Sequence, residues 1–412
     1  MRSAPRMILL FSHFWRNLRR YPFLLGCLSF MPAGFAPLYA EPTPVDPPGL
    51  HVQNGVLTRN GKPYCGIGAN YLLLFARLVT NKDDVSTLDN LAHLAKAGIP
   101  FVRFRANGHR AIGYELYLKD PPEFFRRMDQ VVRCAERNGI GLIPSLFWHL
   151  GAVPQIVGEP ADQLGNPNSK TNAFLRNFTQ EMVSRYKDSP AIWGWEFGNE
   201  ANLATDLPGK ITDEATGITR QRAFGSAQPA ADSLSSQDLR VAYLTFAKTV
   251  RTLDPWRIID TGNSAPRRSA WHNARGQFWR ADTAPQLTNV LVQQNPNPFD
   301  VLSVHIYQKA QSLAPFGLET VSHFIGRYAA MATLIRKPLF IGEFPTSDRA
   351  QTEEFLNAIV TNRVPLSAFW VFDYPQQDQM ENVDFQNQRS FVPELVARAN
   401  RALQLQNNPT TR

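Results

Sequence analysis

Two glutamates close stretches of sequence that are otherwise apolar, and they are the first candidates for chemistry. Glu200 ends the run Trp195-Glu196-Phe197-Gly198-Asn199-Glu200, and Glu343 lies in the run Leu339-Phe340-Ile341-Gly342-Glu343-Phe344. A carboxylate is expensive to remove from water unless it has partners or a reaction to perform. Taken singly, each could be an ordinary solvated loop acid. Two such acids facing across one cavity suit cleavage of a glycosidic bond, in which one protonates the leaving oxygen and the other attacks or activates water.

Other polar and aromatic side chains stand at the ends of similar apolar stretches. They are Arg103, Trp148, His149, His305, Tyr307 and Trp370. A buried arginine needs a carboxylate partner, so we expect Arg103 to face an acid. Alternation along a strand puts His305 and Tyr307 on the same face. Together with the two glutamates, these groups occupy the ends of six strand-like segments, which predicts one shared site.

Short apolar segments alternate with amphipathic ones along the chain and would position these residues. The expected strands are 64–70, 100–106, 140–147, 191–199, 257–261, 299–307, 338–344 and 366–372. The expected helices are 85–97, 121–138, 173–187, 235–253, 318–336, 352–362 and 393–405. The clearest helix begins at Pro121 and is ended by Gly139. The helix after the fifth strand is poorly defined.

Eight strands alternating with helices predict parallel pairing, right-handed crossovers and a single-domain α/β (β/α)₈ TIM barrel. The rival, an open doubly wound sheet, would carry a glycine-rich phosphate turn after an early strand, and none is present. The turn signals Asn54-Gly55 and Asn60-Gly61 predict an N-terminal β-hairpin before the barrel. In a barrel the chemistry lies where the strands end, which is where the candidate residues stand.

Two long loops follow the fourth and fifth strands, at 203–233 and 263–298. Loops of this length are often functional walls or lids, although plain surface excursions are common. We expect these loops to wall a cleft and to set the preferred substrate length. Trp148, Trp271 and Trp279 are candidates for additional platforms that carry a sugar ring, because pyranose C–H faces pack on aromatic faces.

The charge of the 412-residue chain is concentrated at its start. The net charge is +8, and the first 40 residues contribute five arginines and no acid, which leaves +3 for the remainder. Such a small excess without a Lys/Arg run argues against a nucleic-acid groove. Three cysteines cannot build a disulfide framework; Cys65 and Cys134 are expected to be small buried hydrophobes.

The amino-terminal segment resembles an export leader. Arg16, Arg19 and Arg20 precede an apolar stretch that is broken by prolines and glycines and ends at Ala40. This predicts residues 1–40 as a cleaved signal, 41–49 as a Pro-rich linker, 50–405 as the catalytic domain and 406–412 as a tail, in a periplasmic or extracellular monomer. The alternatives are an uncleaved membrane anchor, which these breaks disfavour, and lipidation at Cys27.

Over residues 50–405 the sequence resembles the retaining glycoside hydrolases of the (β/α)₈ clan, most closely family 5, which includes cellulases and mannanases. The residues that carry the resemblance, in order along the strands, are Arg103, His149, Asn199, Glu200, His305, Tyr307, Glu343 and Trp370. The run Gly66-Ile67-Gly68-Ala69-Asn70-Tyr71 is similar to the opening of mannanase-type members, whereas 101–107 and 147–149 match no particular subfamily.

The resemblance implies a role for each residue. Glu343 would be the nucleophile, kept ionised by Arg103 and Tyr307, and Glu200 the acid/base with a raised pKa. Asn199 would bind the sugar 2-hydroxyl, His149 and His305 would orient hydroxyls and the acid/base, and Trp370 would lie under the sugar ring. The implied substrate is a β-1,4-glucan or β-mannan, cut internally.

No cofactor or metal is implied. The histidines are scattered, and no His-Glu-x-x-His motif is present. Two alternatives remain open from the sequence. One is a catalytically silent carbohydrate-binding barrel, and the other is a metal-dependent barrel hydrolase that uses His149 and His305.

Overall fold

The computed structural model describes residues 47–207, 210–212, 219–221, 234–307 and 319–407. The chain divides into two compact units, residues 1–45 and 46–412, and the second is the one described. The predicted leader, most of the predicted linker, most of the loop at 203–233 and most of the tail lie outside the described residues. Among the helices described, none has both the length and the apolar character that a bilayer crossing requires.

All eight predicted barrel strands are present, each within a few residues of its expected bounds. They are β4 (Gly66–Asn70), β5 (Phe101–Arg105), β6 (Gly141–Phe147), β7 (Gly194–Gly198), β10 (Ile258–Asp260), β11 (Leu302–His305), β12 (Leu339–Pro345) and β13 (Leu366–Trp370). Their hydrogen-bonded order is β10-β7-β6-β5-β4-β13-β12-β11, and every pairing within it is parallel. The predicted (β/α)₈ barrel is therefore confirmed.

The ring closes between β10 and β11 without a regular ladder. The backbone N–H of Asp300, just before β11, donates to the carbonyl of Ile259 in β10 at 3.0 Å. Asn295 bridges the same seam, because its Oδ1 accepts from Thr261 Oγ1 at 3.0 Å and from the Ser303 N–H at 3.1 Å. A buried side-chain amide thus supplies the hydrogen bonds that a strand pairing would otherwise make.

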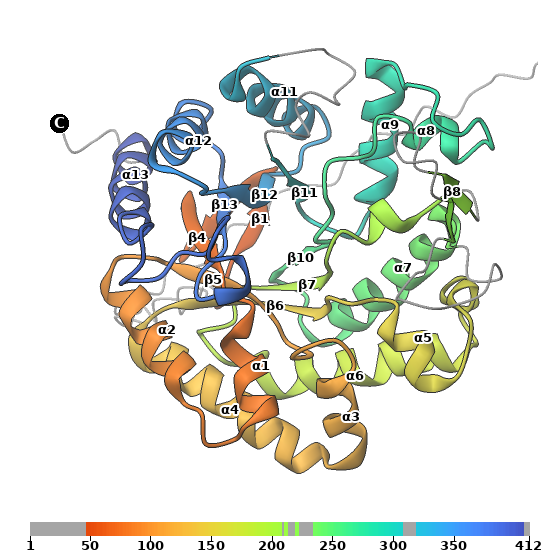
Figure 1. Cartoon of the computed structure of the whole chain (residues 1–412), viewed down its shortest axis with the longest axis horizontal. Coiled ribbons are helices and arrows are strands. Elements are labelled where there is room, and N and C mark those ends of the chain that lie inside the picture. The colour runs from red at the N-terminus through yellow and green to blue at the C-terminus, as the bar shows by residue number, and fades with distance from the viewer. Residues whose placement is uncertain (1–46, 208–209, 213–218, 222–233, 308–318, 408–412) are drawn as a thin grey trace, which may run out of the picture. The chain divides into compact units, whose positions relative to one another are not determined.

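Helices surround these strands, as Figure 1 shows. They are α1 (Leu73–Thr80), α2 (Ser86–Lys96), α3 (Ile112–Lys119), α4 (Pro121–Asn138), α5 (Ala152–Val157), α6 (Lys170–Tyr186), α7 (Ser236–Leu253), α8 (Ala270–Asn273), α9 (Ala284–Gln294), α11 (Val321–Leu334), α12 (Arg349–Thr361) and α13 (Val392–Asn407). The seven predicted helices are confirmed. The short α1, α3 and α5, which lie in the loops after β4, β5 and β6, were not predicted, because a helix of two turns leaves little periodicity to detect.

The N-terminal hairpin is confirmed and packs at the end of the barrel where the strands begin. Strands β1 (His51–Gln53), β2 (Val56–Arg59) and β3 (Lys62–Pro63) form an antiparallel sheet. Leu50 and Leu57 belong to one buried apolar cluster with Phe101 of β5. Since the hairpin covers the amino-terminal end, the carboxyl ends of the strands are left for a site. A further small hairpin, β8 (Lys210–Thr212) and β9 (Thr219–Gln221), lies in the loop after β7.

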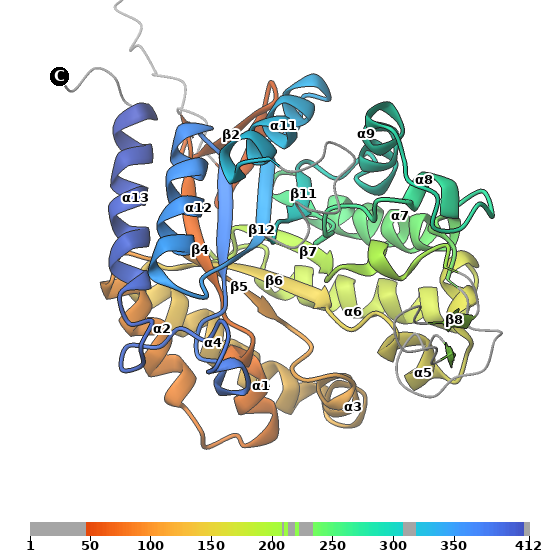
Figure 2. The same cartoon turned by 45° about the horizontal axis from the view of Figure 1, so that its top comes forward.

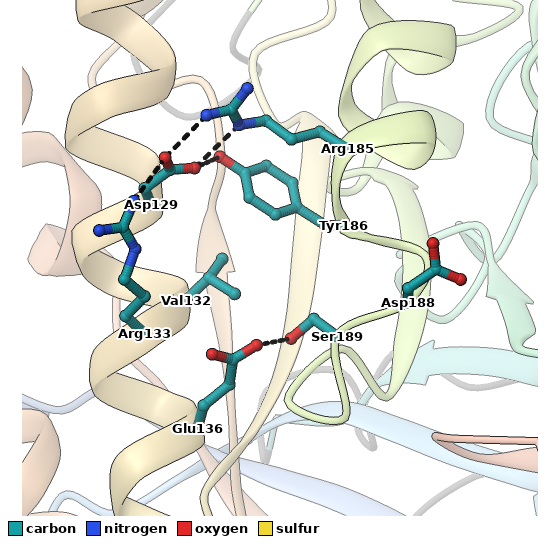
Figure 3. Close-up of a pocket in the computed structure, with 8 residues that line it drawn as sticks. All are labelled: Asp129, Val132, Arg133, Glu136, Arg185, Tyr186, Asp188 and Ser189. Atoms are coloured by element: carbon teal, nitrogen blue, oxygen red, sulfur yellow. Dashed lines mark hydrogen bonds and ion pairs between the residues drawn. The ribbon is translucent and has the colours of Figure 1, made fainter.

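An ion network joins α4 to α6 at the surface (Figure 3). Asp129 accepts hydrogen bonds from Arg133, from Tyr186 and twice from Arg185, at 2.7–2.9 Å. A hollow of about 360 Å³ opens beside it. Its polar side chains are engaged with one another, as in the bond of Ser189 Oγ to Glu136 at 2.6 Å, so we assign this hollow to helix packing.

Asp129→Asn is expected to lower the free energy of unfolding by about 1 kcal/mol at pH 7, because one carboxylate serves four donors. Burial tends to raise the pKa of Asp129, but the hydrogen bonds from Arg185 and Tyr186 outweigh it, so the pKa is lowered. The ionised form therefore stabilises the fold above the ordinary carboxyl pKa of about 4, and the benefit is lost as the pH falls through the lowered value. Urea unfolding from pH 7 down to pH 3 would measure this difference.

Glu353→Gln is the matched control, because Glu353 makes an exposed surface pair with Arg349 at 3.3 Å. It should change stability little at any pH. An Asp129→Asn difference that is absent at pH 7, or that grows in acid, would contradict the assignment.

Candidate active site

Cross-strand register brings the candidate residues together at the carboxyl ends of the strands. Arg103 of β5 pairs with Asn70 of β4, and His305 of β11 pairs with Glu343 of β12. Asn70 and His305 are the last residues of their strands, and Arg103 and Glu343 each lie two positions before the end of theirs. Residues that are as far as 240 positions apart in the chain therefore meet at one end of the barrel.

Arg103 is the centre of the site and is fully buried. Its guanidinium donates to Glu343 at 2.9 Å, to Glu196 at 2.6 Å, to Asn70 at 2.8 Å and to Asn199 at 2.8 Å. The predicted carboxylate partner of Arg103 is thus found, and there are two of them. Charge-assisted bonds of this kind fix the orientation of Glu343 and of the Asn199 amide.

The two glutamates face each other across His305. His305 Nδ1 lies 3.0 Å from Glu200 Oε1 and 3.4 Å from Glu343 Oε1. Glu200 and Glu343 each present an oxygen within 4.8 Å of the other. Tyr307 donates its hydroxyl to the second oxygen of Glu343 at 2.6 Å. A carboxyl pair this close leaves no room for a water between the second carboxylate and the reacting carbon.

Glu200 differs from Glu343 in exposure and in backbone. The side chain of Glu200 is 32% exposed, whereas that of Glu343 is 4% exposed. Glu200 has a positive φ of 48°, a conformation that non-glycine residues adopt only where the surroundings hold it. Its backbone N–H donates to the carbonyl of Gly262 at 2.8 Å, in the loop after β10. Glu200 is therefore the solvent-facing member of the pair, held at a sharp turn.

The protonation preferences are the reverse of those expected from the sequence. Burial would raise the pKa of Glu200, but the effects of His305, Ser264 and Arg103 together outweigh it, so the pKa is lowered. Burial raises the pKa of Glu343, with help from the charge of Glu200 and against the effects of His305, Arg103 and Tyr307. The expectation of a raised pKa for Glu200 in the free site is wrong, because an apolar strand does not reveal where a histidine from another strand will lie.

Three residues that sequence reasoning did not assign to the site lie beneath it. Asn70 donates to the carbonyl of Gly342 at 2.9 Å as well as accepting from Arg103. Asp260 is paired in register with Glu196, and both side chains are buried. Burial and the neighbouring Glu196 raise the pKa of Asp260 well above its ordinary value. The sequence feature that could have identified Glu196 and Asp260 as site residues is the presence of an acid within an otherwise apolar strand.

The aromatic residues divide into two groups. Trp370 is partly buried, donates its indole N–H to Gln377 at 2.8 Å and stacks on Trp148 with the ring centroids 6.3 Å apart. Trp148 is only 5% exposed, and its ring faces the guanidinium of Arg103 at 4.3 Å. Trp148 backs Trp370 and Arg103 and also lines the cavity next to Glu200, so its role as a sugar platform stays a prediction.

Trp271 and Trp279 lie in the loop after β10 and away from the glutamates. The guanidinium of Arg275 lies 3.2 Å above the ring centre of Trp271, which lines a separate cavity of about 290 Å³ with residues of α7 and α9. Trp279 is 51% exposed. Neither residue lines the cavity next to Glu200. The structure does not bring these two predicted platforms to the carboxyl pair.

A cavity of about 640 Å³ adjoins Glu200 and Asn199. His149 lines it and makes no hydrogen bond to either glutamate; its ring instead meets that of His109 at 6.2 Å between centroids. His149 therefore shares the cavity with the carboxyl pair, but it does not orient Glu200 in this structure. Of the two predicted histidines, His305 is the one that contacts Glu200.

Within the described part of the chain, the group whose donor atoms are close enough to share a metal ion consists of Glu200, His305 and Glu343. The surroundings fit a cation poorly. Arg103 lies 2.9 Å from Glu343, and both Glu343 oxygens accept hydrogen bonds, from Arg103 and from Tyr307. A fixed guanidinium at this distance repels a metal cation. His149, the other residue in the metal-dependent hypothesis, is not part of this cluster.

Comparison with known proteins identifies the relatives of this barrel. A model of the cellulase family, glycosyl hydrolase family 5, matches residues 70–375. Mannan endo-1,4-β-mannosidase A of Podospora anserina is 29% identical over 141 residues, which cover 30% of this chain and 37% of that enzyme. Mannan endo-1,4-β-mannosidase F of Aspergillus fumigatus is 31% identical over 162 residues, covering 34% and 35%. The chain thus spans little more than a third of these two relatives.

A solved structure extends the similarity over the whole barrel. The endo-1,4-β-mannanase of Rhizomucor miehei superimposes with a TM-score of 0.60 at 15% identity, covering 86% of this chain and 99% of that chain. At this identity the match concerns the fold.

Proposed function

The chain belongs to glycosyl hydrolase family 5, and we propose that it hydrolyses β-linked glycans with retention of anomeric configuration. The observation that supports this most is the carboxyl pair, Glu200 and Glu343, with oxygens within 4.8 Å at the carboxyl ends of β7 and β12. Retaining enzymes hold their carboxyl groups about 5–5.5 Å apart, and inverting enzymes hold them farther apart to admit a water.

In the first step, Glu343 attacks the anomeric carbon while Glu200 gives its proton to the leaving oxygen. The new bond is a glycosyl ester on Glu343, and the bond to the leaving sugar breaks. In the second step, Glu200 takes a proton from water, which attacks the same carbon and releases Glu343. Arg103 and Tyr307 stabilise the carboxylate of Glu343 before attack and after release.

Substrate binding is expected to favour the protonated form of Glu200, which the free site disfavours. A sugar ring seated between the glutamates removes the remaining exposure of Glu200, and desolvation of a carboxyl raises its pKa. Glu200 is then favoured in its protonated form, while Arg103 and Tyr307 stabilise the ionised form of Glu343. Asn199, held by Arg103, is placed to bind the 2-hydroxyl, and Trp370 to support the ring.

Among β-glycans we propose β-1,4-mannan, with β-1,4-glucan as the second choice, and internal cleavage. The named mannan endo-1,4-β-mannosidases among the relatives support the mannan assignment. Purified protein incubated with mannan, cellulose, mixed-linkage glucan, xylan and chitosan oligosaccharides tests it. Release of short β-1,4-manno-oligosaccharides of retained configuration is the expected result. Binding without cleavage of any member would instead favour the silent carbohydrate-binding barrel.

Tyr307→Phe is expected to lower kcat/KM about 10- to 100-fold and to move its acidic limb to higher pH. Glu343 must be ionised to attack, and the bond from Tyr307 stabilises the ionised form. Without that bond the pKa of Glu343 rises, so the ionised fraction disappears at a higher pH as the solution is acidified. A pH profile of kcat/KM on an aryl β-glycoside measures the shift.

Tyr328→Phe is the control for the loss of a buried hydroxyl, because Tyr328 lies in α11 and burial alone raises its pKa. Its profile should match that of the parent protein. An acidic limb that stays in place or moves to lower pH in Tyr307→Phe would rule out the assigned role of this hydroxyl.

We further propose that the protein is exported through its amino-terminal segment and acts as a monomer outside the cytoplasm. The arginines, apolar stretch and Ala40 in that segment support export. Sequencing the amino terminus of protein recovered from the culture medium or periplasm tests it; a mature chain that still starts at Met1 would count against cleavage.

A further inference from the structure

A buried arginine beside the cavity next to Glu200 has no acidic partner among the described residues. Arg105 follows Arg103 by two positions on β5, and both side chains are buried. Arg103 is matched by two carboxylates, whereas Arg105 donates only to the carbonyl of Leu72 at 3.1 Å and contacts the His109 ring at 3.3 Å. Its Nη2 has no hydrogen-bond partner. A buried guanidinium left in this state is costly unless something else pairs with it.

The neighbours of Arg105 are basic as well. His109, Arg110 and His149 line the cavity of about 640 Å³, and His149 Nε2 is buried without a partner. Burial lowers the pKa of Arg105 to about 10. Burial, followed by the nearby charge of Arg105, lowers the pKa of His149 to about 4. His109, Arg110 and His149 therefore form this wall of the cavity, and the buried guanidinium of Arg105 lies directly behind His109, at 3.3 Å.

We propose that this wall, formed by His109, Arg110 and His149 in front of the buried Arg105, is a carboxylate-binding subsite which accepts a uronic acid unit of the glycan. The proposal rests on the proposed function and narrows its substrate class to β-glycans that carry an acidic sugar. A guanidinium fork matches the two oxygens of a carboxylate.

The position of the wall relative to the carboxyl pair gives the subsite its role. The same cavity is lined by Asn199 and Glu200, so a sugar that occupies it is continuous with one at the reacting centre. A neutral sugar in the same place would leave Arg105 unpaired and dehydrated, which is the basis of discrimination.

Calorimetric binding to the full-length Glu343→Gln protein tests the proposal, because no turnover is then required. The probes are β-1,4-manno- and cello-oligosaccharides oxidised at one C6 to a uronate, and the same oligosaccharides after chemical reduction of that carboxyl. The expected result is about tenfold tighter binding of the acidic member of each pair, as one charge-assisted contact provides. Equal binding of the two members overturns the proposal, and this comparison needs no further variant.

Variants then locate the preference. Arg105→Gln, added to Glu343→Gln, should reduce the ratio of the affinity for the acidic oligosaccharide to that for the neutral one. Should that protein fail to fold, the rim variant Arg110→Gln, also added to Glu343→Gln, should reduce the same ratio. Arg176→Gln, an arginine of α6 whose side chain bonds the Pro167 carbonyl on the surface, is the matched control and should preserve it. A ratio unchanged in both Arg105→Gln and Arg110→Gln overturns the assignment to this wall. Sodium sulfate, sodium phosphate and glucuronate are then compared, at equal ionic strength, as competitors of the acidic oligosaccharide. If sulfate or phosphate competes better than glucuronate, the assignment of a carboxylate ligand is overturned and a general oxyanion site is indicated.

The two proposals fail separately. If the active protein hydrolyses neutral oligosaccharides and shows no preference for uronates, the glycosidase proposal is retained and the subsite proposal is rejected. If the protein binds uronates tightly, in a way that depends on Arg105, but cleaves no glycan, the subsite proposal is retained and the glycosidase proposal is rejected.

Discussion

Glu343→Ala is expected to reduce kcat by about 10⁴-fold or more on every β-glycoside that the protein cleaves. The nucleophile is the only group that can form the glycosyl intermediate, and the loss is of the order seen when a hydrolase loses its nucleophile. Because the covalent step requires Glu343, an activated leaving group cannot compensate. Initial rates on a dinitrophenyl β-glycoside and on a β-glycan should therefore fall together.

Azide provides the second readout of the same variant. The anion fits the space that the carboxylate vacates and attacks the anomeric carbon directly, so the glycosyl azide formed should have inverted configuration. Glu343→Gln keeps the side-chain volume, and Glu115→Ala, an exposed glutamate of α3, controls for handling and should retain parental activity. Residual activity above a few per cent in both Glu343 variants, with parental thermal stability, would remove Glu343 from the mechanism.

Glu200→Ala is expected to separate substrates by their leaving groups. Cleavage of a natural β-glycan should fall by about 10²- to 10⁴-fold, the usual contribution of general acid–base catalysis. A dinitrophenolate needs no proton to leave, so formation of the glycosyl intermediate on Glu343 should persist and its hydrolysis should become slow. A rapid burst of dinitrophenolate followed by a slow steady state is the signature, measured by stopped-flow absorbance.

Azide should accelerate that slow step and give a glycosyl azide of retained configuration, because attack occurs on the intermediate from the side of Glu200. The opposite stereochemical outcomes in the two variants distinguish the roles of the two glutamates in one product analysis. Equal losses on natural and activated substrates in Glu200→Ala, with no burst, would exclude the acid/base assignment.

His305 decides how the proton is distributed in the free site, and this could not be read from the sequence. The sequence placed Glu200 at the end of an apolar strand, which favours the neutral acid. His305 comes from β11 and lies 3.0 Å from Glu200, and together with Ser264 and Arg103 it reverses the preference. The distance depends on the stagger of β11 against β12, where the register shifts between Val304 and His305. Such a shift leaves no trace in the local pattern of residues.

Glu196 and Asp260, which lie beneath the site, also have roles that the sequence alone could not predict. Each is an acid in an apolar strand, and nothing local distinguishes either from Glu200. Pairing of β10 with β7 places Asp260 opposite Glu196, and Arg103 from β5 reaches Glu196 at 2.6 Å. Whether a buried acid supports a site or performs its chemistry depends on which strand ends lie above it.

The order of eight strands and the residues at their ends followed from the sequence alone, because apolar periodicity and turn residues act over a few neighbouring positions. A parallel barrel then leaves little freedom, since right-handed crossovers bring every strand end to one face. The contacts among those ends, the burial of Trp148 behind Trp370 and the unpaired charge of Arg105 were decided only by the closed barrel. They depend on stagger and seam geometry between strands that are distant in sequence, and a one-dimensional pattern does not record those quantities.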